Sequence, residues 1–207
     1  METFDRIEML ESMVILVDSR EQPTEKAKQR YESFGFPYRR STLSYGDYTY
    51  NAKLPNGEWL LDESKTVNGL CILERKMNLD ELASCLTHSR DRFEREFKRA
   101  KENNARILLL VENASWENLL AGKYRSQFRP AAFYGSLISW MMRYDIQLVF
   151  CKSEITGKMI REILYRDLRE RIERGDFDGK VSADSCQDQK KRQRVSRKQT
   201  RKRTTEG

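Results

Sequence analysis

The chain has 207 residues, a length that suits one domain of ordinary size with an appended segment. Hydrophobic residues make up 38% of it, enough for a buried core, and charged residues make up 34%. The net charge of +7 lies at the C-terminus, because residues 187–207 hold nine Lys and Arg residues against two acidic ones. We therefore expect the attraction of the chain for a polyanion to come mainly from this tail.

The same inventory excludes several classes of protein. No segment approaches the ~18 consecutive apolar residues of a membrane span, and the acidic N-terminus lacks the basic-then-apolar order of a signal peptide. The four cysteines show no C-x-x-C spacing and there is a single histidine, so a Cys/His zinc site is not expected. These features predict an intracellular protein with no membrane partner.

Apolar runs and turn signals predict an alternation of strands and helices. The residues Pro55-Asn56-Gly57 form a strong turn signal and predict an antiparallel hairpin or meander in the region from 37 to 61. Strands followed by helices, with hairpins in the middle, predict the α/β class, a mixed β-sheet flanked by helices. The predicted strands are 13–17, 37–43, 47–53, 58–61, 69–73, 106–111 and 147–151, and the predicted helices are 24–34, 78–86, 89–103, 129–144 and 154–174.

The order of these elements predicts three parts of the chain. Residues 1–12 form an N-terminal extension, and residues 13–174 form one folded domain. Residues 175–207 form a basic tail with little to bury, which we expect to be disordered in isolation.

Two of the apolar strands end in charged residues. The first ends at Asp18, and the strand at 69–73 runs into Glu74, Arg75 and Lys76. Residues two apart on a strand share a face, so Glu74 and Lys76 point to one side and Arg75 to the other. Asp47, which follows Gly46, is placed to bring a second carboxylate from a nearby strand.

This combination of residues suits phosphodiester hydrolysis. The reaction needs charge neutralisation on the phosphate and a hydroxide at neutral pH, both of which a carboxylate-held Mg²⁺ supplies. A neighbouring lysine can position or deprotonate the attacking water and offset developing negative charge. The candidate centre is therefore Asp47, Glu74 and Lys76.

The wider pattern resembles the nuclease domain of the XPF/Hef family of structure-specific endonucleases, within the PD-(D/E)XK nuclease superfamily. The signature of that family is G-D, then E-R-K-x-x-x-D, and here it reads Gly46-Asp47 and Glu74-Arg75-Lys76 followed by Asp80. The likeness also includes Val17-Asp18-Ser19-Arg20-Glu21, the residues Arg92, Lys98 and Arg99, and the run 129–137. It covers roughly residues 13–172.

The resemblance implies a restriction-endonuclease-like core that cuts branched, flap or junction DNA in repair or recombination. It implies that Asp47 and Glu74 bind Mg²⁺, which Mn²⁺ can replace, with the main-chain carbonyl of Arg75 as a further ligand. Lys76 then serves the attacking water. The remaining catalytic residues that it implies are Asp18, Arg20, Glu21, Arg75 and Asp80.

Simpler interpretations remain open for several of these residues. Asp80 falls in the first turn of the predicted helix 78–86, where an acid interacts favourably with the helix dipole. Arg20 and Glu21 also fit an ordinary pair of charged residues in a loop. Arg92 is expected to contact phosphate, although mixed charge on the helix 89–103 is also typical of a solvated face.

Residues 175–207 show no sign of the tandem helix-hairpin-helix motifs that commonly follow this nuclease domain. We expect the tail to substitute for them through non-specific phosphate contacts, and the alternative is a localisation or solubility segment. The tail residues assigned to DNA are Lys190, Lys191, Arg192 and Arg194.

A rival hypothesis is a catalytically silent DNA-binding or scaffolding subunit, because dimers in this family can pair an active with an inactive nuclease domain. The intact acids and lysine argue against it. The resemblance also implies a homodimer or heterodimer formed through the helices 129–144 and 154–174. Packing of their apolar faces on the sheet explains the same pattern.

Overall fold

The fold is taken from a computed structural model, which describes residues 3–61 and 69–178. Strands and helices alternate along most of this chain, as the sequence predicts. Their bounds are α1 Thr3–Glu11, β1 Val14–Asp18, α2 Glu25–Glu32, β2 Tyr38–Ser41, β3 Tyr48–Asn51, β4 Cys71–Lys76, α3 Leu79–Leu86, α4 Arg90–Glu102, β5 Arg106–Glu112, α5 Trp116–Leu120, α6 Pro130–Tyr144, β6 Ile146–Cys151, the 3-10 turn η1 Ser153–Ile155 and α7 Thr156–Glu173.

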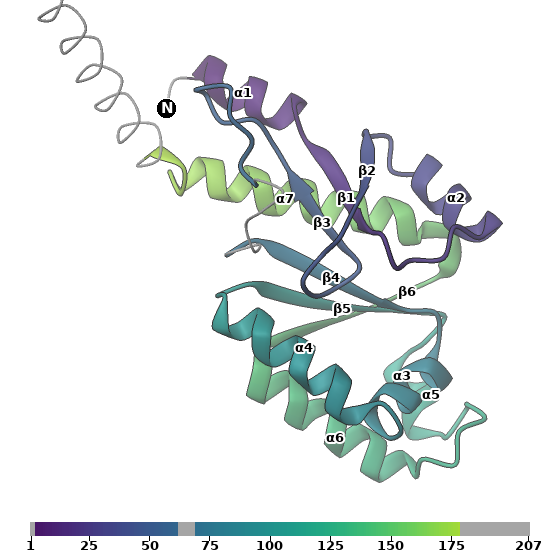
Figure 1. The fold of residues 1–207 in the computed structure, drawn as a ribbon. Coiled ribbons are helices and arrows are strands. Elements are labelled where there is room, and N and C mark those ends of the chain that lie inside the picture. The colour runs from purple at the N-terminus through teal and green to yellow at the C-terminus, as the bar shows by residue number, and fades with distance from the viewer. Residues whose placement is uncertain (1–2, 62–68, 179–207) are drawn as a thin grey trace, which may run out of the picture.

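The strands form one mixed sheet in the spatial order β2-β1-β3-β4-β5-β6. β1 pairs in parallel with β2 and antiparallel with β3, β3 pairs antiparallel with β4, and β4, β5 and β6 run parallel. Helices α1, α2 and α7 lie on one side of the sheet, and α3, α4 and α6 lie on the other, with α5 packed on α6 (Figure 1). The predicted mixed sheet flanked by helices is confirmed.

The predicted meander is wrong in its strand order, because β1 lies between β2 and β3. Ile15 and Val17 of β1 are fully buried, so this apolar strand takes an interior position with a partner on each side. Arg39 and Arg40 of β2 are exposed, and charged side chains are typical of an edge strand. Burial therefore decides the order here, over the proximity of 37–43 and 47–53 in the sequence.

The predicted strand at 58–61 does not form, although the turn before it does. Gly57 takes a φ of +84°, and its N–H donates to Leu54 O at 2.8 Å. One isolated bridge joins Lys53 and Trp59. Beyond this bridge, Asn51 Nδ2 donates to Leu61 O and Asn51 Oδ1 accepts from Leu61 N, each at 2.9 Å. A side chain thus replaces the partner strand, and the ladder ends.

Two helices lie in segments for which no helix was predicted. α1 falls within the predicted extension 1–12 and packs against α7, with Met9 only 1% exposed. α5 is a short helix whose N-cap, Ser115, accepts a hydrogen bond from Asn118 N. On the other side of the predicted boundary at 174, Phe177 is fully buried. The packed body thus includes residues on both sides of the range 13–174.

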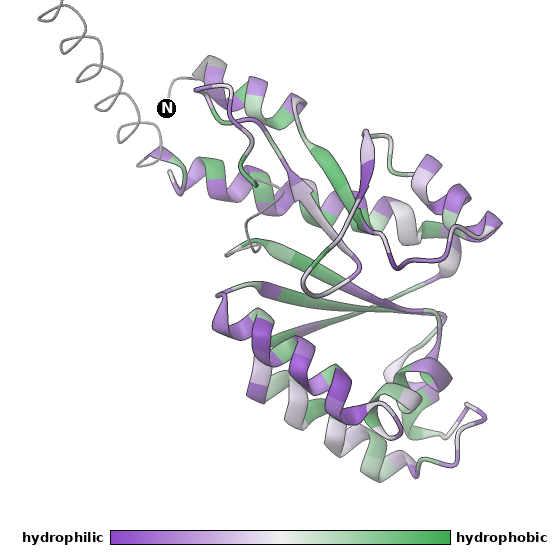
Figure 2. Ribbon diagram, viewed as in Figure 1, coloured by the Kyte–Doolittle hydropathy of each residue, from purple (hydrophilic) through white to green (hydrophobic). Residues whose placement is uncertain are grey.

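The centre of the core is formed by β4 and β5. Residues 71–74 of β4 and 107–112 of β5 are all buried, the pattern of parallel strands covered on both faces. Figure 2 shows hydrophobic colour along much of β1, β4 and β5 and hydrophilic colour over much of α4. Within the described residues, no helix combines the length and the apolar character needed to cross a membrane.

Candidate active site

Strand β4 carries two residues of opposite charge to one face of the sheet. Alternation along the strand directs Glu74 and Lys76 towards α4 and Arg75 towards the opposite face. Lys76 Nζ lies 2.6 Å from Glu74 Oε1 and 5.1 Å from the centre of the Phe93 ring, which α4 contributes. Glu74 is 6% and Lys76 8% exposed, so this is a buried ion pair.

Asp47 joins this pair from the segment that leads into β3. Gly46 takes a φ of +70°, which bends the chain tightly just before Asp47. The backbone of Asp47 is then fixed on both sides, since its N–H donates to Leu73 O at 2.8 Å and its carbonyl accepts from Asp18 N at 2.8 Å. Asp47 Oδ2 accepts the backbone N–H of Arg75 at 2.8 Å. The carboxylate is thereby held against the strand that carries Glu74.

Burial raises the pKa of both carboxyl groups. For Asp47 the negative charge of Glu74 adds to the effect of burial and raises the pKa well above its ordinary value. For Glu74, burial outweighs the favourable charge and hydrogen bond of Lys76, and the pKa is raised. Burial alone would lower the pKa of Lys76, but Glu74 and Asp47 raise it above its ordinary value. Two acids thus share one ammonium, and the centre suits one further cation.

The donor atoms of this centre fit a hard divalent cation such as Mg²⁺. No described residue donates a hydrogen bond to Asp47 Oδ1 or Glu74 Oε2, so each acid keeps one oxygen for a ligand. Proteins commonly bind Mg²⁺ through one or two carboxylates and leave its other positions to water and substrate phosphates. Residues 3–61 and 69–178 hold no group of three or more His, Cys, Asp or Glu side chains arranged for a metal. The fit is therefore to a two-carboxylate site.

Asp18 and Arg20 lie on the same face of the sheet and fix the segment that leads to Gly46. Asp18 is 2% exposed, and both of its carboxylate oxygens have donors. Oδ1 accepts from Leu43 N at 3.2 Å, and Oδ2 accepts from Arg20 Nε at 2.5 Å. Arg20 Nη2 also donates to Leu43 O at 3.0 Å. These contacts give Asp18 an anchoring role, and its predicted catalytic role stays a prediction.

Glu21 and Arg75, which we expected in the charged centre, meet on the opposite face of the sheet. They form a closed ring of alternating charge with Arg30 and Glu112, which we call the charge ring. Arg75 contacts Glu112 at 3.3 Å and Glu21 at 3.7 Å, and Arg30 contacts Glu21 at 3.6 Å and Glu112 at 3.8 Å. The hydroxyl of Tyr48 accepts from Arg30 Nη1 at 2.9 Å and donates to Glu21 Oε2 at 3.1 Å. The charge ring therefore joins α2, β4 and β5 on the face of the sheet opposite to Glu74 and Lys76, and Tyr48 ties it to β3.

Sequence reasoning missed Arg30, Tyr48 and Glu112. The sequence did carry a signal for Glu112. This acid ends the apolar strand β5, just as Asp18 ends β1 and Glu74 follows the apolar residues of β4. Nothing in the spacing of Arg30 or Tyr48 marks them as partners of Arg75.

Asp80 makes its contacts with a distant segment. Its Oδ1 accepts the backbone N–H groups of Arg125 at 2.6 Å and of Ser126 at 2.9 Å. Although its small degree of burial acts in the opposite direction, these N–H groups lower the pKa of Asp80. Asp80 also lies in the first turn of α3, so the favourable interaction with the helix dipole holds as well. The contacts therefore describe a tether between α3 and the segment before α6.

The sequence matches the model of the ERCC4 domain over residues 17–163. The chain belongs to the ERCC4 domain family. Its fold is similar to that of XPF from Aeropyrum pernix, with a TM-score of 0.53 and 19% identity over 79% of this chain and 69% of that one. A second structure, of XPF from Aeropyrum pernix in complex with DNA, gives a TM-score of 0.51 and 22% identity over 74% and 63%. No relative was found among curated protein sequences.

These comparisons confirm the XPF/Hef resemblance in family and in fold. The family match covers every residue of the signature, from Asp47 and Glu74 to Asp80.

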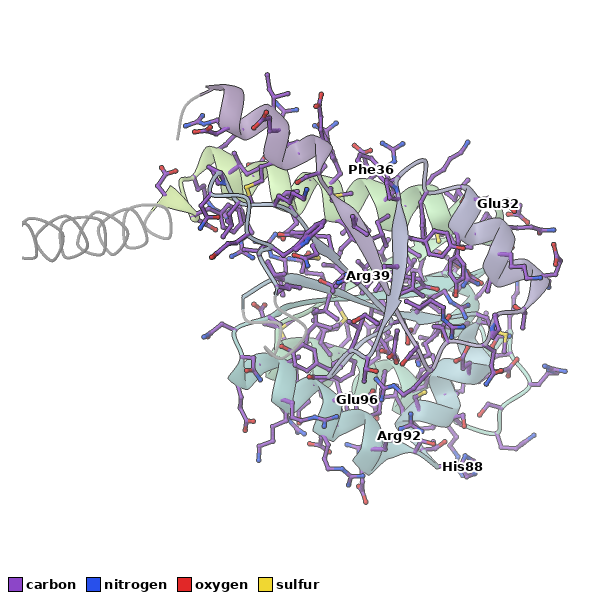
Figure 3. All side chains as sticks on the ribbon, turned by 45° about the horizontal axis from the view of Figure 1, so that its top comes forward. Glu32, Phe36, Arg39, His88, Arg92 and Glu96 are labelled. Carbon is purple, nitrogen blue, oxygen red and sulfur yellow. The ribbon has the colours of Figure 1, made fainter. Side chains whose placement is uncertain are left out.

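The ERCC4 domain has a cationic groove of about 420 Å³ beside the candidate centre. Glu96 lies in the wall of this groove and also in that of a small cavity which Glu74 lines, so the two regions adjoin. Figure 3 shows Arg92 and Glu96 on α4, with His88 near the start of that helix. The groove is lined by Arg20, Arg92, Arg95, Glu96, Lys98, Arg99 and Glu102.

The groove offers more cations to a phosphate backbone than we expected from the sequence. Arg92, Arg95, Lys98 and Arg99 form no ion pair with any acid in the described part of the chain, so their charge is available to a ligand. From the sequence we expected a phosphate contact from Arg92 alone, on a helix whose mixed charge is also typical of a solvated face. The spacing of Arg92, Arg95 and Arg99, which places them on one side of a helix, was a signal for this stripe of cations.

The basic tail of this ERCC4 domain lies outside the described residues. The prediction that it contacts DNA, with the tail residues named above, therefore stays a prediction, as does its predicted disorder beyond residue 178.

Proposed function

We propose that this ERCC4 domain is a Mg²⁺-dependent endodeoxyribonuclease that hydrolyses phosphodiester bonds in branched, flap or junction DNA during repair or recombination. Mn²⁺ should be able to replace Mg²⁺. The observation that carries the proposal is the group formed by Asp47 with the buried Glu74 and Lys76. It adjoins a groove in which four cations of α4 have no acidic partner among the described residues. Acids for a metal, a lysine for the reacting water and a surface for phosphates are the parts that this chemistry requires.

In this proposal Asp47 and Glu74 hold the metal through the oxygens that accept no hydrogen bond, with the main-chain carbonyl of Arg75 as a further ligand. A bound Mg²⁺ supplies Lewis-acid activation of water and neutralises charge on the phosphate. The ammonium of Lys76 orients the attacking water and offsets the negative charge that develops on the phosphate. The N–H of Arg75 keeps the Asp47 carboxylate in place for this role.

Arg20 connects the centre to the groove, because it contacts Asp18 and also lines the groove beside Arg92. We assign it and Arg92 to the phosphates next to the scissile bond, where a planar guanidinium suits bidentate contacts. The DNA complex of XPF from Aeropyrum pernix supports DNA as the ligand of this fold. Tail residues 190–194 would add contacts to the DNA backbone.

Dimerisation through α6 and α7 is also part of the proposal. Phe133 and Leu137 of α6 are buried in the domain, which leaves Tyr134 at 39% and Met142 at 74% exposure for an interface.

The alternative function is a catalytically silent DNA-binding or scaffolding subunit. We test the two with the purified full chain on linear, flap, fork and four-way DNA, with Mg²⁺, with Mn²⁺ and with EDTA, for wild type and Glu74→Gln. The enzyme should cut at least one branched substrate with either metal, and Glu74→Gln should not. Wild-type protein that binds branched DNA and never cuts it would favour the scaffold.

A further inference from the structure

The segment between α5 and α6 exposes positive charge in an alternating pattern. Gly122, Tyr124, Ser126 and Phe128 are partly buried, whereas the residues between them are exposed. The exposed positions include Lys123, Arg125 and Arg129, which together we call the loop cations. From Asn118 to Tyr144 the chain has no acidic residue, so no neighbour in the sequence offsets their charge.

The shape of this segment is fixed from the inside. Tyr124 OH donates to Phe128 O at 2.7 Å, and the rings of Tyr124 and Phe128 pack on Phe133 of α6 with centroids 5.4 and 5.2 Å away. Lys123 N donates to Asn118 O at 2.8 Å. The loop cations therefore project from a braced backbone, and little ordering entropy remains to oppose the binding of a ligand.

Asp80 connects this backbone to the catalytic strand. Its carboxylate accepts two N–H groups of the segment, from Arg125 and Ser126. The next residue, Glu81, reaches the other way: its Oε1 lies 3.9 Å from Lys76 Nζ, and its Oε2 accepts from Met77 N at 2.8 Å. The first turn of α3 thus holds the catalytic lysine on one side and the cationic segment on the other.

We propose that the loop cations form a second DNA-phosphate surface, separate from the groove on α4, and that Asp80 is the positioning residue that sets it relative to Lys76. This inference rests on the proposed DNA function. Charge complementarity identifies the ligand. Among the described residues, Lys123 and Arg129 have no acidic partner, and Arg125 has an ion pair with Asp80 alone. The side chain of Arg125 remains 91% exposed in that pair. Arginines and lysines on one edge of a rigid loop match the spaced charges of a DNA backbone.

The surface is tested with the triple variant Lys123→Gln, Arg125→Gln, Arg129→Gln. The matched control is Lys26→Gln, Lys28→Gln, Lys158→Gln, which removes the same charge from exposed positions on α2 and α7, on the other side of the sheet. The dissociation constant of a fluorescein-labelled flap DNA is measured by anisotropy in EDTA, so that binding is separated from cleavage. Each lost phosphate contact lowers the salt slope by about 0.9 on duplex DNA.

For three contacts, the ratio of the dissociation constants at about 200 and about 50 mM salt should fall about 40-fold in the loop variant. The control variant should stay near the wild-type ratio. Equal changes in the two variants would mean that only net charge matters, and they would overturn the proposal. This binding assay contains no metal, so its result does not depend on cleavage. If the wild type fails to cut DNA in the separate assay with metal, that failure counts against the proposed nuclease and not against this surface.

The role of Asp80 is tested by combining it with the same triple variant. Asp80→Ala removes the acceptor for Arg125 N and Ser126 N, so it should weaken binding in the wild-type background and have little further effect in the triple variant. Asp80→Asn keeps an acceptor oxygen and should restore most of the affinity. If Asp80→Ala weakens binding equally in both backgrounds, Asp80 does not act through the loop. Thermal unfolding of each variant verifies that the comparison is made on folded protein.

Discussion

Replacing Gly46 by alanine should damage both the fold and the metal site, since Gly46 lies against β4 in a left-handed conformation. A Cβ at this position would come within 2.1 Å of the Ile72 side chain and 3.2 Å of Leu73 O. The φ of +70° costs a non-glycine residue about 1–2 kcal/mol. Forcing an added carbon into a packed interior costs about 1–3 kcal/mol more. We therefore expect Gly46→Ala to lose about 2–5 kcal/mol of unfolding free energy.

Gly35→Ala is the matched control, because Gly35 has a similar φ of +65° and nothing within 4 Å of a built Cβ. It should lose only the conformational term of about 1–2 kcal/mol. Urea denaturation of wild type and both variants gives the two losses from the transition midpoints at constant slope. Because Asp47 follows Gly46, the clash should also weaken the stabilisation that Mg²⁺ gives to the folded state. Equal losses in the two variants, with Mg²⁺ stabilisation intact in Gly46→Ala, would refute this reasoning.

Other predictions concern the buried charges. Burial and Glu74 raise the pKa of Asp47, so the metal-free fold should lose stability as the pH rises from the ordinary carboxyl range through the raised pKa. Asp47→Asn should remove that loss, and it should add about 1 kcal/mol to the free energy of unfolding at neutral pH in EDTA. A pH-independent difference in thermal unfolding would contradict it. Glu112→Gln leaves Arg30 and Arg75 with one acid and should cost about 3 kcal/mol in urea, whereas the exposed Glu25→Gln should cost little; similar losses would argue against the charge ring.

The sequence allowed the centre to be predicted where the chemistry depends on local order. Alternation along a strand was enough to place Glu74 and Lys76 on one face and Arg75 on the other. Gly46 indicated the tight turn that brings Asp47 to β4. The class of the fold followed from the order of strands and helices.

Features that depend on distant pairing could not be predicted in the same way. The tether of Asp80 joins residues 45 positions apart, and the charge ring draws on strands and a helix whose order in space was unknown. The strand order itself follows from burial, which placed β1 inside the sheet and the charged β2 at its edge. The stripe on α4 was readable from its spacing, but mixed charge on a helix is also common where nothing binds.

The central claim is that Asp47, Glu74 and Lys76 form a metal-dependent nuclease centre. Its most direct test is the single-turnover rate of flap DNA cleavage in Mg²⁺ for Asp47→Asn, Glu74→Gln and Lys76→Met, with Glu25→Gln as the exposed control. The rate should fall at least about 100-fold in each of the three variants and stay at the wild-type value in the control. Cleavage by the wild type in EDTA would contradict the claim. Cleavage at the wild-type rate by any of the three variants would contradict it as well.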